Sequence, residues 1–144
     1  MAVLTVGDVY DEQGAVREQF VLDAVQTKGA KSRTVWINAK LRRQLELYRS
    51  TLRFTDANRA LFQSQKGGAF SANTMTQLFV NIYRAVGFEN ASSHSGRRTF
   101  ITELASKGVS VRVLAELAGH SSIQTTQRYI DVNPQQMSAA VELL

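Results

Sequence analysis

Four side chains in the C-terminal third of the chain could together act on a phosphate ester. They are His94 and Arg97 in the segment SSHSGRRTF, His120 in LAGHSS and Tyr129 in QTTQRYID. A tyrosine can attack a phosphodiester and hold one product as a phosphotyrosine, provided that cations stabilise the charge on the non-bridging oxygens. The planar guanidinium of Arg97 can bind two such oxygens at once.

The two histidines of the chain suit the same chemistry. Each can donate a hydrogen bond to a phosphate oxygen, or accept the proton that a phenol with a free pKa of about 10 must lose. Each residue also has a structural explanation. Tyr129 can be a half-buried aromatic, although Ile123 and Ile130 already supply apolar packing beside it, and a histidine after Gly119 can cap a helix. Phosphate chemistry is therefore indicated only by the whole set in this order.

The order of these residues resembles the C-terminal signature of the tyrosine recombinases, also called the phage integrase family. The pattern is H-x-x-R, then a Gly-His turn, then a tyrosine nine residues later within T-T-x-x-Y. The resemblance covers residues 92–131, including the apolar residues between the polar ones, and reaches back through TKGAKSR to DVYDEQG. It implies site-specific DNA recombination or integration through a 3′-phosphotyrosine, without a metal or other cofactor.

The resemblance also implies a role for each residue. Tyr129 is the expected nucleophile and Arg97 the phosphate clamp. His94 is expected to act as a general base or phosphate ligand, and His120 to donate to the phosphate. These four side chains should then line one basic pocket, with Arg97 and His120 facing a common space.

A further group of cations lies in the loop QTKGAKSR, residues 26–33. Such cations often serve only solubility. In the family, however, a lysine on this hairpin protonates the leaving 5′-hydroxyl, and the match gives that role to Lys28, with Lys31 as the second candidate. A general acid must come within about 3 Å of the bridging oxygen, and its pKa must fall from about 10.4. Nearby Lys31 and Arg33 lower it, and we expect both, with Arg98, to bind DNA.

One element of the family pattern has no match in this chain. The first catalytic arginine of the family lies on a helix ahead of the sheet, in a pattern like G-L-R-x-x-E-L. Arg17 is the only arginine before the hairpin, and it lies in a turn and strand. We therefore expect residues 1–144 to be one N-terminally truncated catalytic domain, with residues 1–37 forming a small sheet and residues 38–144 a helical part. A catalytically incompetent relic that only binds DNA stays open as an alternative.

Composition agrees with a partner that is an acidic polymer. The formal net charge is +5 and the isoelectric point is near 9.9, as expected for a protein that binds double-stranded DNA. The absence of cysteine excludes thiolate metal sites, and two histidines without a nearby acidic cluster argue against a metal-dependent nuclease. Without a membrane-span or signal pattern, we expect a cytoplasmic, DNA-associated protein of bacterial or phage origin.

The hydrophobic pattern predicts an α+β fold of the DNA breaking-rejoining type, mainly helical, with a three-stranded antiparallel sheet at its N-terminal edge. The strand patterns are residues 4–10, 16–22 and 33–37, with a glycine turn at 11–14. Helix patterns with their expected caps occupy residues 38–52, 71–86, 94–107, 110–119, 121–129 and 134–143. Ser121 and Gln124 form the expected capping box of the fifth helix.

Two further points concern a rival interpretation and the expected protein partners. A helix-turn-helix DNA-binding protein is the rival interpretation, since Leu114, Ala118 and Gly119 fit its first half. Its second half fails, because Thr125 and Arg128 stand where a recognition helix needs apolar residues. By resemblance, we expect other recombinase protomers to assemble with this chain on DNA, with the C-terminal helix docking on a neighbour.

Overall fold

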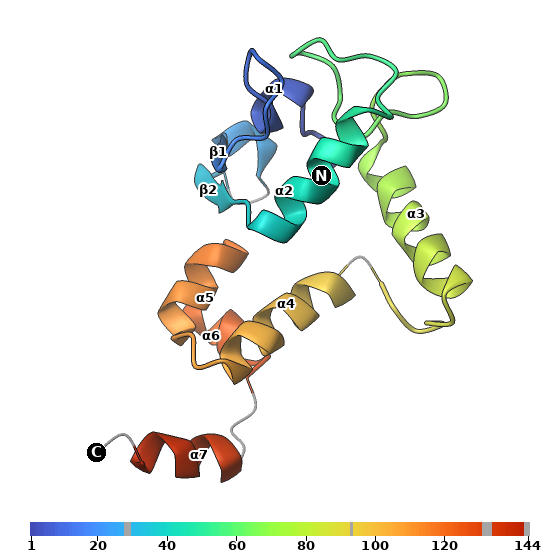
Figure 1. Ribbon diagram of the computed structural model, residues 1–144. Coiled ribbons are helices and arrows are strands. Elements are labelled where there is room, and N and C mark those ends of the chain that lie inside the picture. Colours follow the sequence, from blue (N-terminus) through green and yellow to red (C-terminus); the bar gives the residue numbers. More distant parts are fainter. Residues whose placement is uncertain (28–29, 93, 131–133, 143–144) are drawn as a thin grey trace. The chain divides into compact units, whose positions relative to one another are not determined.

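The structure is a computed structural model that describes residues 1–27, 30–92, 94–130 and 134–142. The chain divides into two compact units, Met1–Ile82 and Tyr83–Leu144, here called the N-terminal and C-terminal units. Figure 1 shows the order of the elements along the chain. Each unit is described by itself below, and the expected single domain over the whole chain stays a prediction.

The sheet of the N-terminal unit has two strands in the described residues. Strand β1, Gln19–Leu22, pairs antiparallel with β2, Arg33–Trp36, with Gln19 opposite Trp36 and Leu22 opposite Arg33 (Figure 1). The second and third strand patterns are thus confirmed, although β1 begins three residues later than expected. The expected three-stranded sheet is wrong.

The segment expected to form the first of the three strands, residues 4–10, contains a short helix instead. Helix α1, Val6–Val9, begins with a capping box in which the Thr5 amide donates to the Asp8 carboxylate at 2.7 Å and the Asp8 amide donates to the Thr5 hydroxyl at 3.3 Å. Alternation of apolar residues suits a strand, but a Thr-x-x-Asp pair satisfies two amides that only a helix start exposes. Isolated bridges from Thr5 to Ala60 and from Tyr10 to Val16 flank the helix.

The core of the N-terminal unit gathers around α1. Its buried side chains are Val6, Val9, Tyr10, Val16, Ile37 and Leu61. The Tyr10 hydroxyl donates to the carbonyl of Leu45 on helix α2, Ala39–Arg49, at 2.7 Å. Asn38 caps α2 as predicted, accepting from the Leu41 amide at 2.8 Å, but the helix ends three residues before the expected residue 52.

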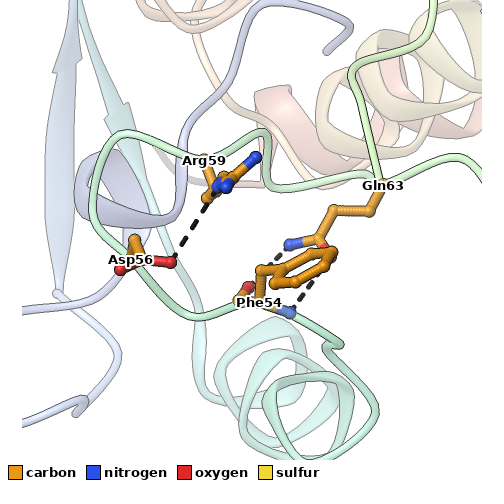
Figure 2. Close-up of polar contacts among 4 residues, drawn as sticks. All are labelled: Phe54, Asp56, Arg59 and Gln63. Carbon is orange, nitrogen blue, oxygen red and sulfur yellow. Dashed lines mark hydrogen bonds and ion pairs between the residues drawn. The ribbon is translucent and has the colours of Figure 1, made fainter. Parts of the chain in front are cut away.

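The loop after α2 is held by local side-chain contacts (Figure 2). The side-chain amide of Gln63 makes two hydrogen bonds to the backbone of Phe54. Its Oε1 accepts from the Phe54 N–H at 3.3 Å, and its Nε2 donates to the Phe54 carbonyl at 2.7 Å. The guanidinium carbons of Arg53 and Arg59 lie 5.5 and 5.0 Å from the centre of the Phe54 ring. Gly67, at φ +78°, fits against the same ring, because a Cβ there would come within 2.6 Å of it. The loop is therefore ordered without regular secondary structure.

Helix α3, Ala72–Ala85, begins where the sequence indicates. The Ser71 hydroxyl accepts from the Thr74 amide at 3.1 Å. The helical spacing of five apolar residues predicts one buried face, formed by Met75, Leu78, Phe79, Ile82 and Val86. Of these, Met75 is buried, whereas Leu78, Ile82 and Val86 are exposed. Helical spacing indicates that apolar residues share a face, but it does not indicate what covers that face.

The C-terminal unit contains four helices in its described residues: α4, Ser95–Ser106; α5, Val111–Ala118; α6, Ile123–Gln127; and α7, Pro134–Val141 (Figure 1). Its core is formed by Ile101, Leu114 and Ala118, which are almost fully buried. Phe100 is apolar and lies on α4 beside Ile101, but its side chain is 44% exposed. The inward-facing side of α4 is formed by Ile101, Leu104 and Ala105. Phe100 precedes Ile101 by one position, so its side chain points to a different side of the helix. On α5, Ala115 is buried, whereas the larger Leu117 is only half-buried.

The start of α6 differs from the expected capping box. The cap residue is Ser122 rather than Ser121, and its hydroxyl bonds to the Gln124 side chain instead of a backbone amide. Helix α7 begins at Pro134 as predicted and ends at Val141, two residues short of the expected end. Its expected cap, Asn133, lies outside the described residues. Among the described helices, none has the length and apolar character needed to cross a membrane.

Candidate active site

All four residues expected to act on phosphate lie in the C-terminal unit. His94 occupies the position before the first turn of α4, where its carbonyl accepts from the Arg98 amide at 3.0 Å. Arg97 lies in that first turn, three residues further on. Because residues three apart share one side of a helix, the sequence H-x-x-R places both side chains on the same side of α4. Both residues are exposed, as ligands of a large substrate must be.

Arg97 contacts the end of the next helix. Its Nη1 donates to the carbonyl oxygen of Ala118 at 2.8 Å. That carbonyl belongs to the last turn of α5, where helical carbonyls lack intrahelical partners and carry the negative end of the helix dipole. A guanidinium has five N–H donors, and this contact uses one of them. The charge of Arg97 is thus fixed at the C-terminal end of α5, with donors left for an anion.

The end of α5 also fixes the backbone of His120. Gly119 adopts a left-handed conformation with φ +69° and ψ 36°, and its amide donates to the Glu116 carbonyl at 3.0 Å. The His120 amide donates to the Ala115 carbonyl at 2.9 Å. This is a Schellman-type helix end, which glycine favours because it has no Cβ. Arg97 and His120 therefore both contact the last turn of α5, Arg97 through the carbonyl of Ala118 and His120 through the carbonyl of Ala115.

The ring of His120 is held by a residue that the sequence did not single out. Its Nδ1 lies 2.8 Å from the hydroxyl oxygen of Thr126 on α6, and Thr126 is fully buried. The ring centre of His120 lies 6.2 Å from that of Tyr129, with 27° between the ring planes. The only sequence signal for Thr126 is its place three residues before the tyrosine in T-T-x-x-Y.

Tyr129 lies two residues beyond the end of α6, not in its last turn as expected. Its amide donates to the Thr126 carbonyl at 3.0 Å. The half-buried side chain packs against the core of Ile101, Leu114 and Ala118. Ile123 and Ile130 gave no need for Tyr129 in the core, yet its side chain does pack there, as its alternative interpretation as a half-buried aromatic has it. The core itself positions the phenol, and places its ring beside that of His120.

The expected cations of the hairpin loop belong to the N-terminal unit. Lys28 lies outside the described residues. Lys31 is exposed, and its backbone is tied to the Thr27 hydroxyl, which donates to the Lys31 carbonyl at 2.9 Å. Arg33 is half-buried at the start of β2, and Arg98 is exposed on α4. Lys31 and Arg98 thus have the accessibility that a contact to DNA phosphate requires.

Two other kinds of site receive no support from the described part of the chain. No group of three or more His, Cys, Asp or Glu side chains that could hold a metal ion occurs there. The helix that would serve as recognition helix in a helix-turn-helix protein is α6, which spans five residues. That length is too short to lie along a DNA groove and present several base contacts.

The chain is similar to known DNA recombinases. The model of the phage integrase family matches residues 1–136. The tyrosine recombinase XerC of Myxococcus xanthus is 34% identical over 121 residues, which cover 78% of this chain and 40% of that protein. The chain thus spans less than half the length of this relative.

Solved structures share the fold. The crystal structure of XerA recombinase matches 99% of this chain and 49% of its own, with a TM-score of 0.75 at 23% identity. The XerH site-specific recombinase bound to a palindromic difH substrate, in a post-cleavage complex, matches 97% of this chain and 39% of its own, with a TM-score of 0.67 at 23% identity. The mixed, mainly helical recombinase fold predicted from the sequence is therefore confirmed.

Proposed function

Because the chain belongs to the phage integrase family, we propose that it provides the tyrosine-bearing part of a site-specific DNA recombinase. The observation that carries the proposal is the convergence at the end of α5. There the Arg97 guanidinium binds the Ala118 carbonyl, and His120, two residues later, has its ring beside that of Tyr129. A cation, a hydrogen-bond donor and a nucleophile thus come from three helical segments to one region.

The proposed reaction is a transesterification. The phenolic oxygen of Tyr129 attacks the phosphorus of a DNA phosphodiester, the bond from phosphorus to the 5′-oxygen breaks, and that oxygen takes up a proton. The product is a 3′-phosphotyrosine and a free 5′-hydroxyl. Attack by a 5′-hydroxyl of another strand reverses the step and restores a phosphodiester, so that the reaction needs no nucleotide cofactor.

Each remaining side chain has a proposed part in this step. Arg97 and His120 donate hydrogen bonds to the non-bridging oxygens, where charge gathers in the transition state. His94 accepts the phenolic proton or binds the phosphate, and its exposure at the start of α4 suits either task. Lys28 supplies the proton to the leaving oxygen.

Double-stranded DNA is the proposed partner, together with further recombinase protomers. The net charge of +5 supports a polyanion, and exposed Lys31 and Arg98 supply phosphate contacts. The solved relative XerH was captured on its difH substrate, which shows DNA bound by a protein of this fold. Assembly through α7 with a neighbouring protomer is part of the proposal.

Covalent capture tests the reaction. A library of nicked duplexes with randomised sequence is incubated with the chain, and with a chimera that adds the preceding part of Myxococcus xanthus XerC. Denaturation, protease digestion and mass spectrometry then locate any DNA-linked peptide. We expect the adduct on Tyr129 in the chimera, and its loss in Tyr129→Phe but not in the control Tyr83→Phe. An adduct that survives Tyr129→Phe overturns the assignment, and DNA binding without any adduct favours a protein that only binds DNA.

A further inference from the structure

We propose that Thr126 is a positioning residue that orients the ring of His120 and fixes its neutral form with the proton on Nε2. The inference rests on the proposed function and deepens it, because it specifies how His120 becomes a hydrogen-bond donor to phosphate. Thr126 itself is buried and does not touch the substrate. Its effect therefore passes through His120.

Thr126 differs from two other helical threonines of this chain, Thr76 and Thr102. The hydroxyls of Thr76 and Thr102 donate back to the carbonyls four residues earlier, Ala72 and Arg98, at 3.0 and 3.1 Å. This is the usual choice for a threonine within a helix. The hydroxyl of Thr126 instead lies 2.8 Å from Nδ1 of His120, six residues earlier in the chain. The bond crosses from α6 to the junction after α5, so it holds the ring rather than the local helix.

The burial of Thr126 decides which atom carries the proton. A hydroxyl has one proton to donate, and Nδ1 of His120 is its hydrogen-bond partner among the described residues. If Nδ1 carried the ring proton, it would donate to the hydroxyl oxygen, and the hydroxyl proton would have no acceptor. A buried donor without an acceptor is costly. The hydroxyl therefore donates to Nδ1, and the neutral ring carries its proton on Nε2.

This arrangement has a chemical consequence. An Nε2–H group donates to a non-bridging phosphate oxygen whether the ring is neutral or charged, so His120 keeps its donor at neutral pH. The same residue also connects to the nucleophile, because the Thr126 carbonyl accepts from the Tyr129 amide at 3.0 Å. Thr126 thus fixes the donor with its side chain and the nucleophile with its backbone.

Nuclear magnetic resonance of the histidine rings tests the proposal directly. The chain has two histidines, so a long-range proton–nitrogen spectrum of the ¹⁵N-labelled protein contains two ring systems, and His94 serves as an internal reference. The variants are Thr126→Val, which removes the hydroxyl at nearly constant volume, and Thr126→Ser, which keeps it. Thr102→Val is the matched control, since it removes a helical hydroxyl from the same unit without touching a histidine.

At a pH above the titration of histidine, we expect His120 of the unmodified chain and of Thr126→Ser to show only the form protonated on Nε2. Thr126→Val should lose this preference and show a mixture of both neutral forms at His120, with His94 unchanged. Thr102→Val should leave both rings unchanged.

Either of two results overturns the proposal. One is a protonated Nδ1 at His120 in the unmodified chain, and the other is an unchanged His120 spectrum in a folded Thr126→Val variant. If Thr126→Val does not fold, as judged by circular dichroism, the spectra of the unmodified chain and of Thr126→Ser still decide. Because this experiment contains no DNA, its failure is separate from a failure to form the covalent adduct.

Discussion

Replacement of Gly119 by alanine should disturb the candidate site through the backbone. Gly119 has φ +69°, in the left-handed region where a Cβ clashes with the following carbonyl. That conformation costs a residue other than glycine about 1 to 2 kcal/mol. The alternative is that α5 ends differently, and then the amides of Gly119 and His120 lose their bonds to Glu116 and Ala115. We therefore expect Gly119→Ala to lower the free energy of unfolding by about 1 to 2 kcal/mol.

Gly108 supplies the matched control for this prediction. It also follows a helix with a positive φ, +82°, and a Cβ built there meets no atom within 4 Å. Gly108→Ala should therefore cost a similar amount of stability, since the backbone strain is the same. Only Gly119→Ala should also shift the ring signals of His120, because only Gly119 precedes that residue.

Urea unfolding followed by circular dichroism, together with the histidine spectra, measures both effects. An unfolding midpoint of Gly119→Ala equal to that of the unmodified chain would refute the strained junction. A shift of the His120 signals as large in Gly108→Ala as in Gly119→Ala would refute the argument that Gly119 positions the histidine.

Three further predictions concern DNA binding, catalysis and packing. The logarithm of the DNA-binding constant should fall linearly with the logarithm of salt concentration. Lys31→Gln should reduce the steepness of this slope by about 1. A binding constant that does not change with salt concentration would contradict the phosphate contacts. In the chimera, Arg97→Lys should slow the formation of the covalent adduct by about a hundredfold, as measured on denaturing gels. Arg98→Lys should have a much smaller effect. Equal rates for both variants would disprove the role of Arg97 as phosphate clamp. Leu114→Ala should destabilise the C-terminal unit by about 2 to 5 kcal/mol in urea unfolding, because Leu114 is fully buried. Val113 is half-exposed, so Val113→Ala should cost less than about 0.5 kcal/mol. Similar losses in the two variants would contradict the described core.

Local signals in the sequence predicted much of the fold. Asn38 and Ser71 cap the helices that follow them, and Gly119 ends α5, because each acts on backbone groups within a few residues of itself. The first of the three expected strands was predicted wrongly because the alternation at residues 4–10 competed with the Thr5 and Asp8 capping box. The local sequence is compatible with a strand and with a helix at these residues, and the structure has the helix that the capping box stabilises.

The candidate site shows the same division between local and distant information. The spacing of His94 and Arg97 follows from one helix, and the Gly-His junction follows from one helix end, so the sequence indicated both. The bond from Arg97 to Ala118 and the bond from Thr126 to His120 each join different segments. Such contacts depend on how helices pack, which periodicity within one segment does not specify.

The loop around Phe54 has a consequence for how this protein can meet an acidic polymer. The guanidinium groups of Arg53 and Arg59 lie close to the ring of Phe54. Gln63 holds the backbone of Phe54 (Figure 2). A free arginine side chain loses rotational entropy when it binds, on the order of 1 to 2 kcal/mol. Arg59 is further restrained by the Asp56 carboxylate, 3.9 Å from its Nε. Both arginines therefore lose less entropy, so an anion that reaches this loop meets side chains whose directions are largely set before contact.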